Sequence, residues 1–105
     1  MIFSEDVVFR LKDKVYVSSE NKFGEITGLF QVDNQSWADI NFFETPTVDT
    51  ETGMLFCRAN SYEVTRMVRL DSLSVPLITA IEDELIWFIS HKSENFIWLN
   101  EHLFQ

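Results

Sequence analysis

Hydrophobic and polar residues alternate through the first part of the chain. Phe9, Leu11, Val15 and Val17 share one parity, and the polar run 12–14 lies between the two pairs. A period of two places apolar side chains on one face of a β-strand and polar side chains on the other. The pattern therefore predicts two half-buried strands, with a turn at positions 12–14.

Similar extended patterns recur further along the chain. A turn-rich loop at 45–53 interrupts them, and the stretches predicted to be strands are 23–32, 37–43, 54–58 and 62–70. The alternation in these stretches predicts a mostly antiparallel β-rich body over 7–70. The residues expected in its core are Val15, Val17, Ile26, Ile40, Phe42, Val64 and Val68.

Two glycines, Gly24 and Gly28, lie inside the predicted strand 23–32. Glycine weakens a strand and gives it no side chain to pack, so it usually marks a bulge, a bend or a close approach of another backbone. Short strands that close into a small barrel must bend sharply. We therefore expect a strongly coiled strand at this position.

The spacing of apolar residues changes after Pro76. Ile78, Ile81 and Leu85 recur at steps of three and four residues, and Thr79 followed by Glu82 matches a helix capping box. Acidic residues at 82–84 would also suit the positive end of a helix dipole. This spacing predicts a helix over about 77–91.

The last residues, 93–105, allow two interpretations. A second short helix would place Phe96, Leu99 and Leu103 on one side. Alternatively, the apolar runs LIWFI and FIWL would pair as a β-hairpin around the polar SHKSEN. The cap and the periodicity favour helix for the first of these runs.

These patterns together predict an α+β fold within one domain, residues 1–105. A small antiparallel β-barrel or curled sheet occupies 7–76, and a C-terminal helical segment occupies 77–105. A chain of 105 residues with 46% hydrophobic residues is long enough to bury one core. Its size and composition are typical of a single globular domain.

Charge narrows the classes of partner. Eight Lys and Arg against seventeen Asp and Glu give a net charge of −9. Such a surface repels phosphate backbones and anionic membranes, so it disfavours nucleic-acid and membrane binding and suits a basic protein partner.

A single cysteine, Cys57, permits no internal disulfide and is expected to be a small core residue. The N-terminus lacks the features of a signal peptide, and no apolar run approaches the ~18 residues of a membrane span. We therefore expect a cytoplasmic protein.

The segments DKVYV at 13–17, FGEITGL at 23–29, WADINFF at 37–43 and YEVTRMVRLDSLSVP at 62–76 resemble the small SH3-like barrels of bacteria, the KOW- and Tudor-like group. The resemblance covers about residues 11–76 and implies a bacterium or one of its mobile elements as the origin. The chain departs from the family pattern in a longer region at 44–58, in its acidic charge and in its last 29 residues, 77–105. Such barrels host many functions, so the resemblance implies a fold more than an activity.

Catalytic and metal-binding patterns are missing from the sequence. No serine lies in a Gly-x-Ser-x-Gly setting, and His91 and His102 are eleven residues apart with no close pair of metal ligands. No glycine-rich loop is suited to a phosphate. We therefore expect no enzyme activity, no metal and no cofactor.

Aromatic residues are the more informative feature, because they make up 14% of the chain and occur on both faces of 37–43. A small barrel has only one interior, so one face must be covered by the C-terminal segment or left for a partner. We therefore expect a protein-interaction domain with exposed aromatics ringed by carboxylates. The residues predicted to bind the partner are Trp37, Phe43, Glu82, Asp83, Glu84, Trp87 and Trp98.

Two alternative functions also fit the sequence. An inhibitor or immunity protein would block a basic or nucleic-acid-binding site by charge mimicry, using residues 82–84 with Asp49 and Glu51. A small-molecule binder would have an aromatic pocket lined by Tyr16, Trp37 and Tyr62. In addition, the apolar C-terminal segment 95–105 is expected either to fold back or to form a homodimer.

Overall fold

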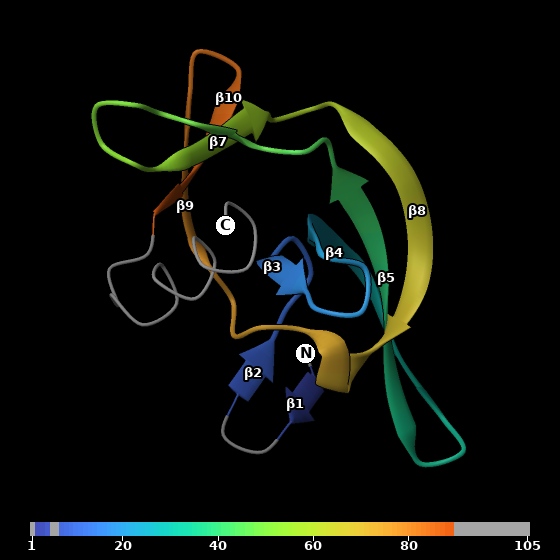
Figure 1. The fold of residues 1–105 in the computed structure, drawn as a ribbon. Coiled ribbons are helices and arrows are strands. Elements are labelled where there is room, and N and C mark those ends of the chain that lie inside the picture. Colours follow the sequence, from blue (N-terminus) through green and yellow to red (C-terminus); the bar gives the residue numbers. More distant parts are fainter. Residues whose placement is uncertain (1, 5–6, 90–105) are drawn as a thin grey trace.

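Nearly all the regular structure is β-strand. The computed structural model describes residues 2–4 and 7–89, and within them the only helical element is one short 3-10 turn, η1 (Figure 1). In chain order the elements are β1 Ile2–Ser4, β2 Val7–Phe9, β3 Lys14–Val17, β4 Lys22–Val32, β5 Gln35–Phe43, β6 Thr47–Val48, β7 Leu55–Arg58, β8 Tyr62–Arg69, η1 Leu70–Ser72, β9 Ile78–Glu82 and β10 Leu85–Ile89.

The first sheet is an antiparallel meander in the order β3-β4-β5-β8. Its long central hairpin, β4–β5, is joined by Asp33 and Asn34, which have φ values of 50° and 65°. Asp and Asn tolerate this left-handed conformation better than most residues, and a two-residue turn of this kind matches the twist of the strands. The sequence thus contains a local signal for the hairpin and for its register.

The first sheet curls so strongly that β3, its first strand, is hydrogen-bonded along both edges: to β4 on one side and to a later segment of the chain on the other. The pairing of β4 with β5 shifts between Ile26 and Gly28, which is the bulge expected from the glycine. Residues 72–77 then run beside the free edge of β3, where Ser74 N–H donates to the Tyr16 carbonyl and Leu77 N–H to the Lys14 carbonyl, both at 2.8 Å. This closure is compatible with a small β-barrel-like domain.

A second antiparallel sheet has the order β6-β7-β10-β9. Its strands come from the two regions that depart from the barrel pattern: the long insertion at 44–58 and the chain after Pro76. The two regions form one structural unit, because β7 pairs with β10 over Leu55–Arg58 and Leu85–Phe88. Figure 1 shows this sheet at one end of the curled first sheet.

The predicted helix over 77–91 is wrong, and with it the α+β fold class: the described chain is all-β. Residues 78–89 form the β9–β10 hairpin, in which Thr79 and Glu82 are strand residues instead of a capping box. Asp83 and Glu84 make the turn, with φ values of 52° and 64°. The sequence lacks the Asn-Gly signal that usually reveals such a turn. Long-range pairing of β10 with β7 outweighs the helical spacing.

The alternative hairpin between LIWFI and FIWL can be followed only in its first half. LIWFI is a strand, β10, but β7 and β9 occupy both of its edges along Leu85–Phe88. FIWL and the possible second helix at 93–105 lie outside the described residues.

Two buried clusters form the core. The first lies inside the curled sheet and includes Val15, Val17, Ile26, Ile40, Phe42 and Val68, as predicted. Val64 was also predicted to be buried, but it is 37% exposed on β8, which forms one edge of the sheet. The second cluster lies between the two sheets and consists of Tyr16, Phe23, Phe43, Leu55, Cys57, Ala59, Ile86 and Phe88.

Candidate functional site

The face of the first sheet that points away from the first core changes character along its length. At one end Tyr16, Phe23 and Phe43 are buried beneath the second sheet. Phe88 of β10 stacks on Phe23 with ring centroids 4.4 Å apart and meets the edge of Phe43 at 6.0 Å. The second sheet therefore covers this aromatic end, which was expected to need a cover.

A polar band separates the covered end from the rest of the face. Lys14 and Glu25, opposite one another on β3 and β4, form an ion pair at 2.9 Å. On the next two strands, the Thr65 hydroxyl donates a hydrogen bond to the Asn41 side-chain oxygen. This band marks the limit of the second core, because its side chains satisfy one another at the sheet surface.

Beyond the band, the same face carries a second group of apolar residues that no described residue covers. Phe30 of β4 lies opposite Trp37 of β5, and Met67 of β8 lies opposite Asp39. Val32 is 53% exposed and Met67 50% exposed, while Phe30 is exposed and Trp37 half-buried. We refer to Phe30, Val32, Trp37 and Met67 as the outer-face patch.

The sheet itself shapes the outer-face patch. Gly28 lies opposite Asp39, and a Cβ atom at Gly28 would come within 2.9 Å of two atoms of the Phe30 ring. The tip of the Phe30 ring therefore occupies the space that a side chain at position 28 would fill. Arg69, opposite Trp37, borders the patch and pairs with Asp71 at 3.5 Å. The patch is thus a shaped apolar surface with charged groups at its rim.

Trp, Phe, Met and Arg are the residue types enriched at the centres of protein interfaces. Aromatic side chains have few rotatable bonds, so Phe30 and Trp37 lose little conformational entropy when a partner covers them. The chemistry available to the outer-face patch is therefore apolar contact with a charged rim. It has the composition of a protein-binding surface.

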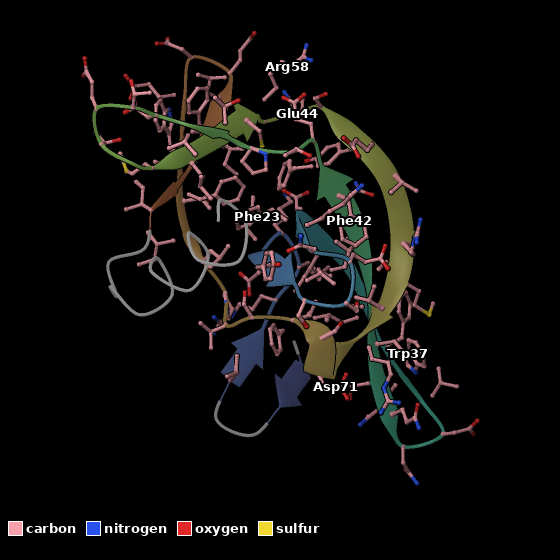
Figure 2. The ribbon with its side chains drawn as sticks, in the orientation of Figure 1. Phe23, Trp37, Phe42, Glu44, Arg58 and Asp71 are labelled. Carbon is pink, nitrogen blue, oxygen red and sulfur yellow. The ribbon has the colours of Figure 1, made fainter. Side chains whose placement is uncertain are left out.

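The structure separates the predicted partner-binding aromatics. Trp37 belongs to the outer-face patch, and Figure 2 shows it at the opposite end of β5 from Glu44. Phe43 is only 1% exposed and is a core residue between the sheets. Trp87 lies on the second sheet, where its ring packs on Phe56 at 4.7 Å. Trp98 is outside the described residues.

Three predicted acidic residues lie together at the β9–β10 turn. Glu82, Asp83 and Glu84 are exposed, and none of them forms an ion pair with another described residue. Their turn adjoins the C-terminal end of β7, where Ala59 N–H donates to the Glu84 carbonyl at 2.9 Å. Asp49 and Glu51 lie in the loop before the other end of β7. The five carboxylates therefore do not form one cluster.

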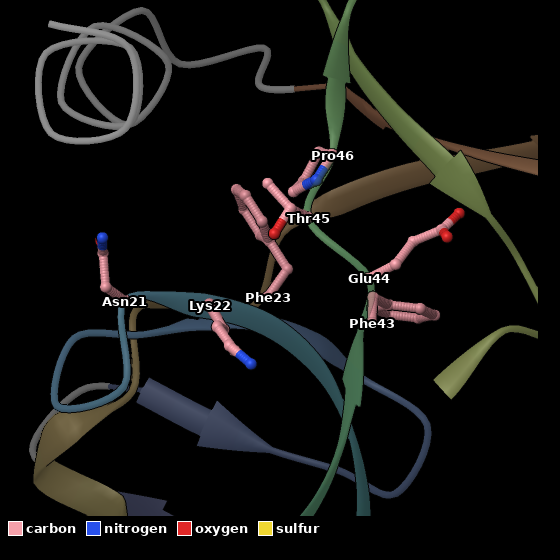
Figure 3. Close-up of a pocket in the computed structure, with 7 residues that line it drawn as sticks. All are labelled: Asn21, Lys22, Phe23, Phe43, Glu44, Thr45 and Pro46. Atoms are coloured by element: carbon pink, nitrogen blue, oxygen red, sulfur yellow. The ribbon is translucent and has the colours of Figure 1, made fainter. Parts of the chain in front are cut away.

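A small pocket opens between the start of β4 and the segment after β5 (Figure 3). Its volume is about 170 Å³, and its lining residues are Asn21, Lys22, Phe23, Phe43, Glu44, Thr45 and Pro46. Tyr16, Trp37 and Tyr62, which were predicted to line an aromatic pocket, are not part of this lining. Tyr16 donates a hydrogen bond to the Asn21 side chain, Tyr62 packs on Phe43 at 5.2 Å, and Trp37 is in the outer-face patch.

Glu44, at the rim of this pocket, is engaged with β7. Its carboxylate accepts a hydrogen bond from Arg58 N–H at 3.0 Å, and the Arg58 guanidinium lies 3.4 Å away. The hydrogen bond from the backbone and those from the guanidinium lower the pKa of Glu44. In Figure 3 the Glu44 side chain points away from Phe23, so the carboxylate ties the two sheets together instead of entering the pocket.

Groups suited to covalent chemistry are few in the described part. Cys57 is buried, and desolvation, with a smaller contribution from the charge of Glu44, raises the pKa of its thiol to about 12. Such a thiol is a poor nucleophile because it stays protonated. Within residues 2–4 and 7–89, no three His, Cys, Asp or Glu side chains are placed to hold a metal ion. His91 and His102 lie outside these residues.

Sequence reasoning missed Phe30, Val32 and Met67. The turn at Asp33 and Asn34 was the available signal, because counting outwards from a two-residue turn places Phe30 opposite Trp37 and Val32 opposite Gln35. That register places Phe30 and Val32 of β4 on the same face as Trp37 of β5. Met67 required the pairing of β5 with β8, which no local signal specifies.

The chain matches no protein-family model, no curated protein and no solved structure. Within the described residues, no helix is long and apolar enough to cross a membrane.

Proposed function

We propose that this protein is a non-enzymatic protein-interaction module that binds its partner through the outer-face patch. The observation that carries the proposal is the exposure of Phe30, Val32 and Met67 beside the half-buried Trp37, on one sheet face whose other aromatic end is buried. Side chains of this size are normally buried, and a contiguous group of them at the surface is typical of an interface.

The charge of the chain supports a basic protein as the partner. A net charge of −9 attracts a positively charged protein over a distance and speeds its encounter with the patch. The same charge disfavours nucleic acid and anionic membranes. The proposal includes a cytoplasmic location and an origin in a bacterium or a mobile element.

We also propose that the curled first sheet is an SH3-like barrel. The support is the strand order β3-β4-β5-β8, a meander whose first strand is bonded again by residues 72–77. In this proposal the second sheet is an addition that covers one end of the barrel's outer face and leaves the outer-face patch open.

A photo-crosslinking experiment tests the function. Benzoylphenylalanine replaces Met67 in one variant and Leu11 in a control, which is exposed but lies outside the patch. The proteins crosslinked in extracts of the native host are identified by mass spectrometry, purified, and titrated against wild type and Trp37→Ala. We expect crosslinks at position 67 that position 11 does not give. We also expect Trp37→Ala to weaken binding by about 2 kcal/mol or more, as at an interface hot spot.

Equal crosslinking at positions 67 and 11, or an affinity unchanged by Trp37→Ala, would rule out the outer-face patch as the binding surface. The fold of each variant is checked by circular dichroism. Trp37 is only half-buried, so its replacement should leave the two core clusters intact.

A further inference from the structure

Strand β9 forms one edge of the second sheet. It pairs with β10 over all of Ile78–Glu82, and no described residue pairs with its other edge. An open strand edge presents unpaired N–H and C=O groups and is a template for another strand.

The hydrogen-bond pattern identifies which groups of β9 are free. Ala59 N–H donates to the Glu84 carbonyl, so the backbone groups of Ile86 and Phe88, which follow Glu84 at steps of two residues in β10, also face β7. In antiparallel pairing, the backbone groups of successive residues point to opposite edges. Leu85, Trp87 and Ile89 therefore bond to Glu82, Ala80 and Ile78. The N–H and C=O groups of Thr79 and Ile81 point outwards.

This edge lacks the usual protection against strand addition. Natural edge strands are blunted by charged side chains, proline or bulges, and none of these occurs in Ile78–Ile81; the one charged residue of β9 is Glu82, at its end. Instead, Ile78 is 44% exposed and Ile81 is 64% exposed. The edge therefore offers both free backbone groups and apolar side chains.

The charge at one end of this edge indicates what kind of strand would bind. Glu82 and the turn residues Asp83 and Glu84 form no ion pair with the rest of the described chain. An occupant with Lys or Arg at this end would complement them. A second copy of this chain would bring the same negative charge, so the complementarity favours a different, basic partner.

We propose that β9 binds an extended basic peptide segment of a partner protein as a fifth, antiparallel strand of the second sheet. Antiparallel addition places the N-terminal end of the peptide beside Glu82, so its basic residues come first and apolar or β-branched residues follow. Thr79 and Ile81 supply the backbone hydrogen bonds. The inference rests on the proposed function only in that a protein is bound, and it uses a surface separate from the outer-face patch.

Fluorescence anisotropy with the full chain and a labelled synthetic peptide, KRKVTTI, tests the proposal. In the proposed register the lysine at its third position lies opposite Glu82, its valine opposite Ile81 and its isoleucine opposite Ile78. We expect saturable binding that weakens as salt is raised, and no binding of the charge-reversed peptide EEEVTTI. Thr79→Pro removes one outward N–H, which proline at an edge strand permits, and should weaken binding about tenfold.

A second variant keeps the proposal testable if Thr79→Pro does not fold. Glu82→Gln with Asp83→Asn and Glu84→Gly removes the charges and gives the turn an Asn-Gly pair, which favours the same hairpin. This variant should bind KRKVTTI more weakly and with less dependence on salt. The matched control, Asp33→Asn with Asn34→Gly, makes the same kind of change in the β4–β5 turn and should bind like wild type. Trp37→Ala should also bind like wild type, which separates this site from the outer-face patch.

Three results would overturn the proposal: no binding of KRKVTTI, equal binding of EEEVTTI, or equal loss of binding in the Asp33→Asn/Asn34→Gly control. A further decisive result is binding that occurs only after residues 90–105 are deleted. The edge would then belong to the chain's own terminus and not to a partner.

Discussion

Gly24 and Gly28 lie in the same strand, but an added side chain would meet different neighbours at the two positions. A Cβ atom at Gly24 would come within 2.2 Å of the Cγ2 atom of Ile40 and 3.0 Å of the Asn41 carbonyl oxygen. At Gly28 the nearest atoms belong to the ring tip of Phe30, which is exposed and can turn away. Core packing against Ile40 therefore requires glycine at position 24. At position 28, glycine leaves room for the tip of the Phe30 ring.

We predict that Gly24→Ala destabilises the fold by about 1–3 kcal/mol, the usual cost of overpacking a core. Gly28→Ala should cost less, because only the Phe30 ring must move. Urea denaturation of both variants measures the difference. Equal losses at the two positions would contradict this account of β4.

Cys57 provides a second test at the scale of single residues. Burial raises the pKa of its thiol to about 12 in the folded chain. We therefore predict that, below that pH, a thiol reagent labels native protein far more slowly than urea-unfolded protein. Because the unfolded thiol loses its proton near its ordinary pKa, stability should also fall as pH rises from that value towards 12. Rapid labelling of the native chain at pH 8 would show that Cys57 is not buried between the sheets.

At the scale of elements, the β9–β10 hairpin is where sequence reasoning failed. Ile78, Ile81 and Leu85 have helical spacing, but the strand exposes Ile78 and Ile81 at an open edge, where no alternation is enforced. β10 reads as a continuous apolar run because one face enters the core and the other carries Trp87 against Phe56. By contrast, β3 and β5 each bury one parity in the first cluster, so their alternation was enough to predict both strands and core.

Substitutions in β10 distinguish a strand from a helix. Ile86 is fully buried and Leu85 only partly buried, because they point to opposite faces of the sheet. We predict that Ile86→Ala costs about 2–5 kcal/mol, as for other buried aliphatic residues, and that Leu85→Ala costs clearly less. Denaturant unfolding measures both. The reverse order would favour the helical arrangement, in which Leu85 belongs to the core stripe.

At the scale of the whole molecule, the arrangement depends on contacts between distant parts of the chain. The insertion at 44–58 and the hairpin at 78–89 form one sheet because β7 pairs with β10. Nothing local in either segment specifies that pairing. The sequence did predict a barrel-like body and an aromatic face that needs covering. The division of that face into a covered end at Phe43 and an open end at Trp37 could not be predicted without the second sheet.

Self-association is a separate prediction about the whole chain. Residues 95–105 include several large apolar side chains, and we predict that they support a homodimer. Sedimentation equilibrium should show a dimer whose population rises with salt, since screening weakens repulsion between chains of charge −9. Deletion of 95–105 should give a monomer. A wild-type chain that is monomeric at every concentration would exclude the dimer.

Amide hydrogen exchange, resolved by NMR, tests the central claim that β9 is an open edge strand of a second sheet. The pairing of β9 with β10 predicts slow exchange at Ala80 and Glu82, whose N–H groups face β10. It predicts fast exchange at Thr79 and Ile81, whose N–H groups point outwards. Slow exchange at all four residues would show that the edge is covered. Fast exchange at Ala80 and Glu82, with protection from Asp83 onwards, would instead indicate a helix and contradict the fold.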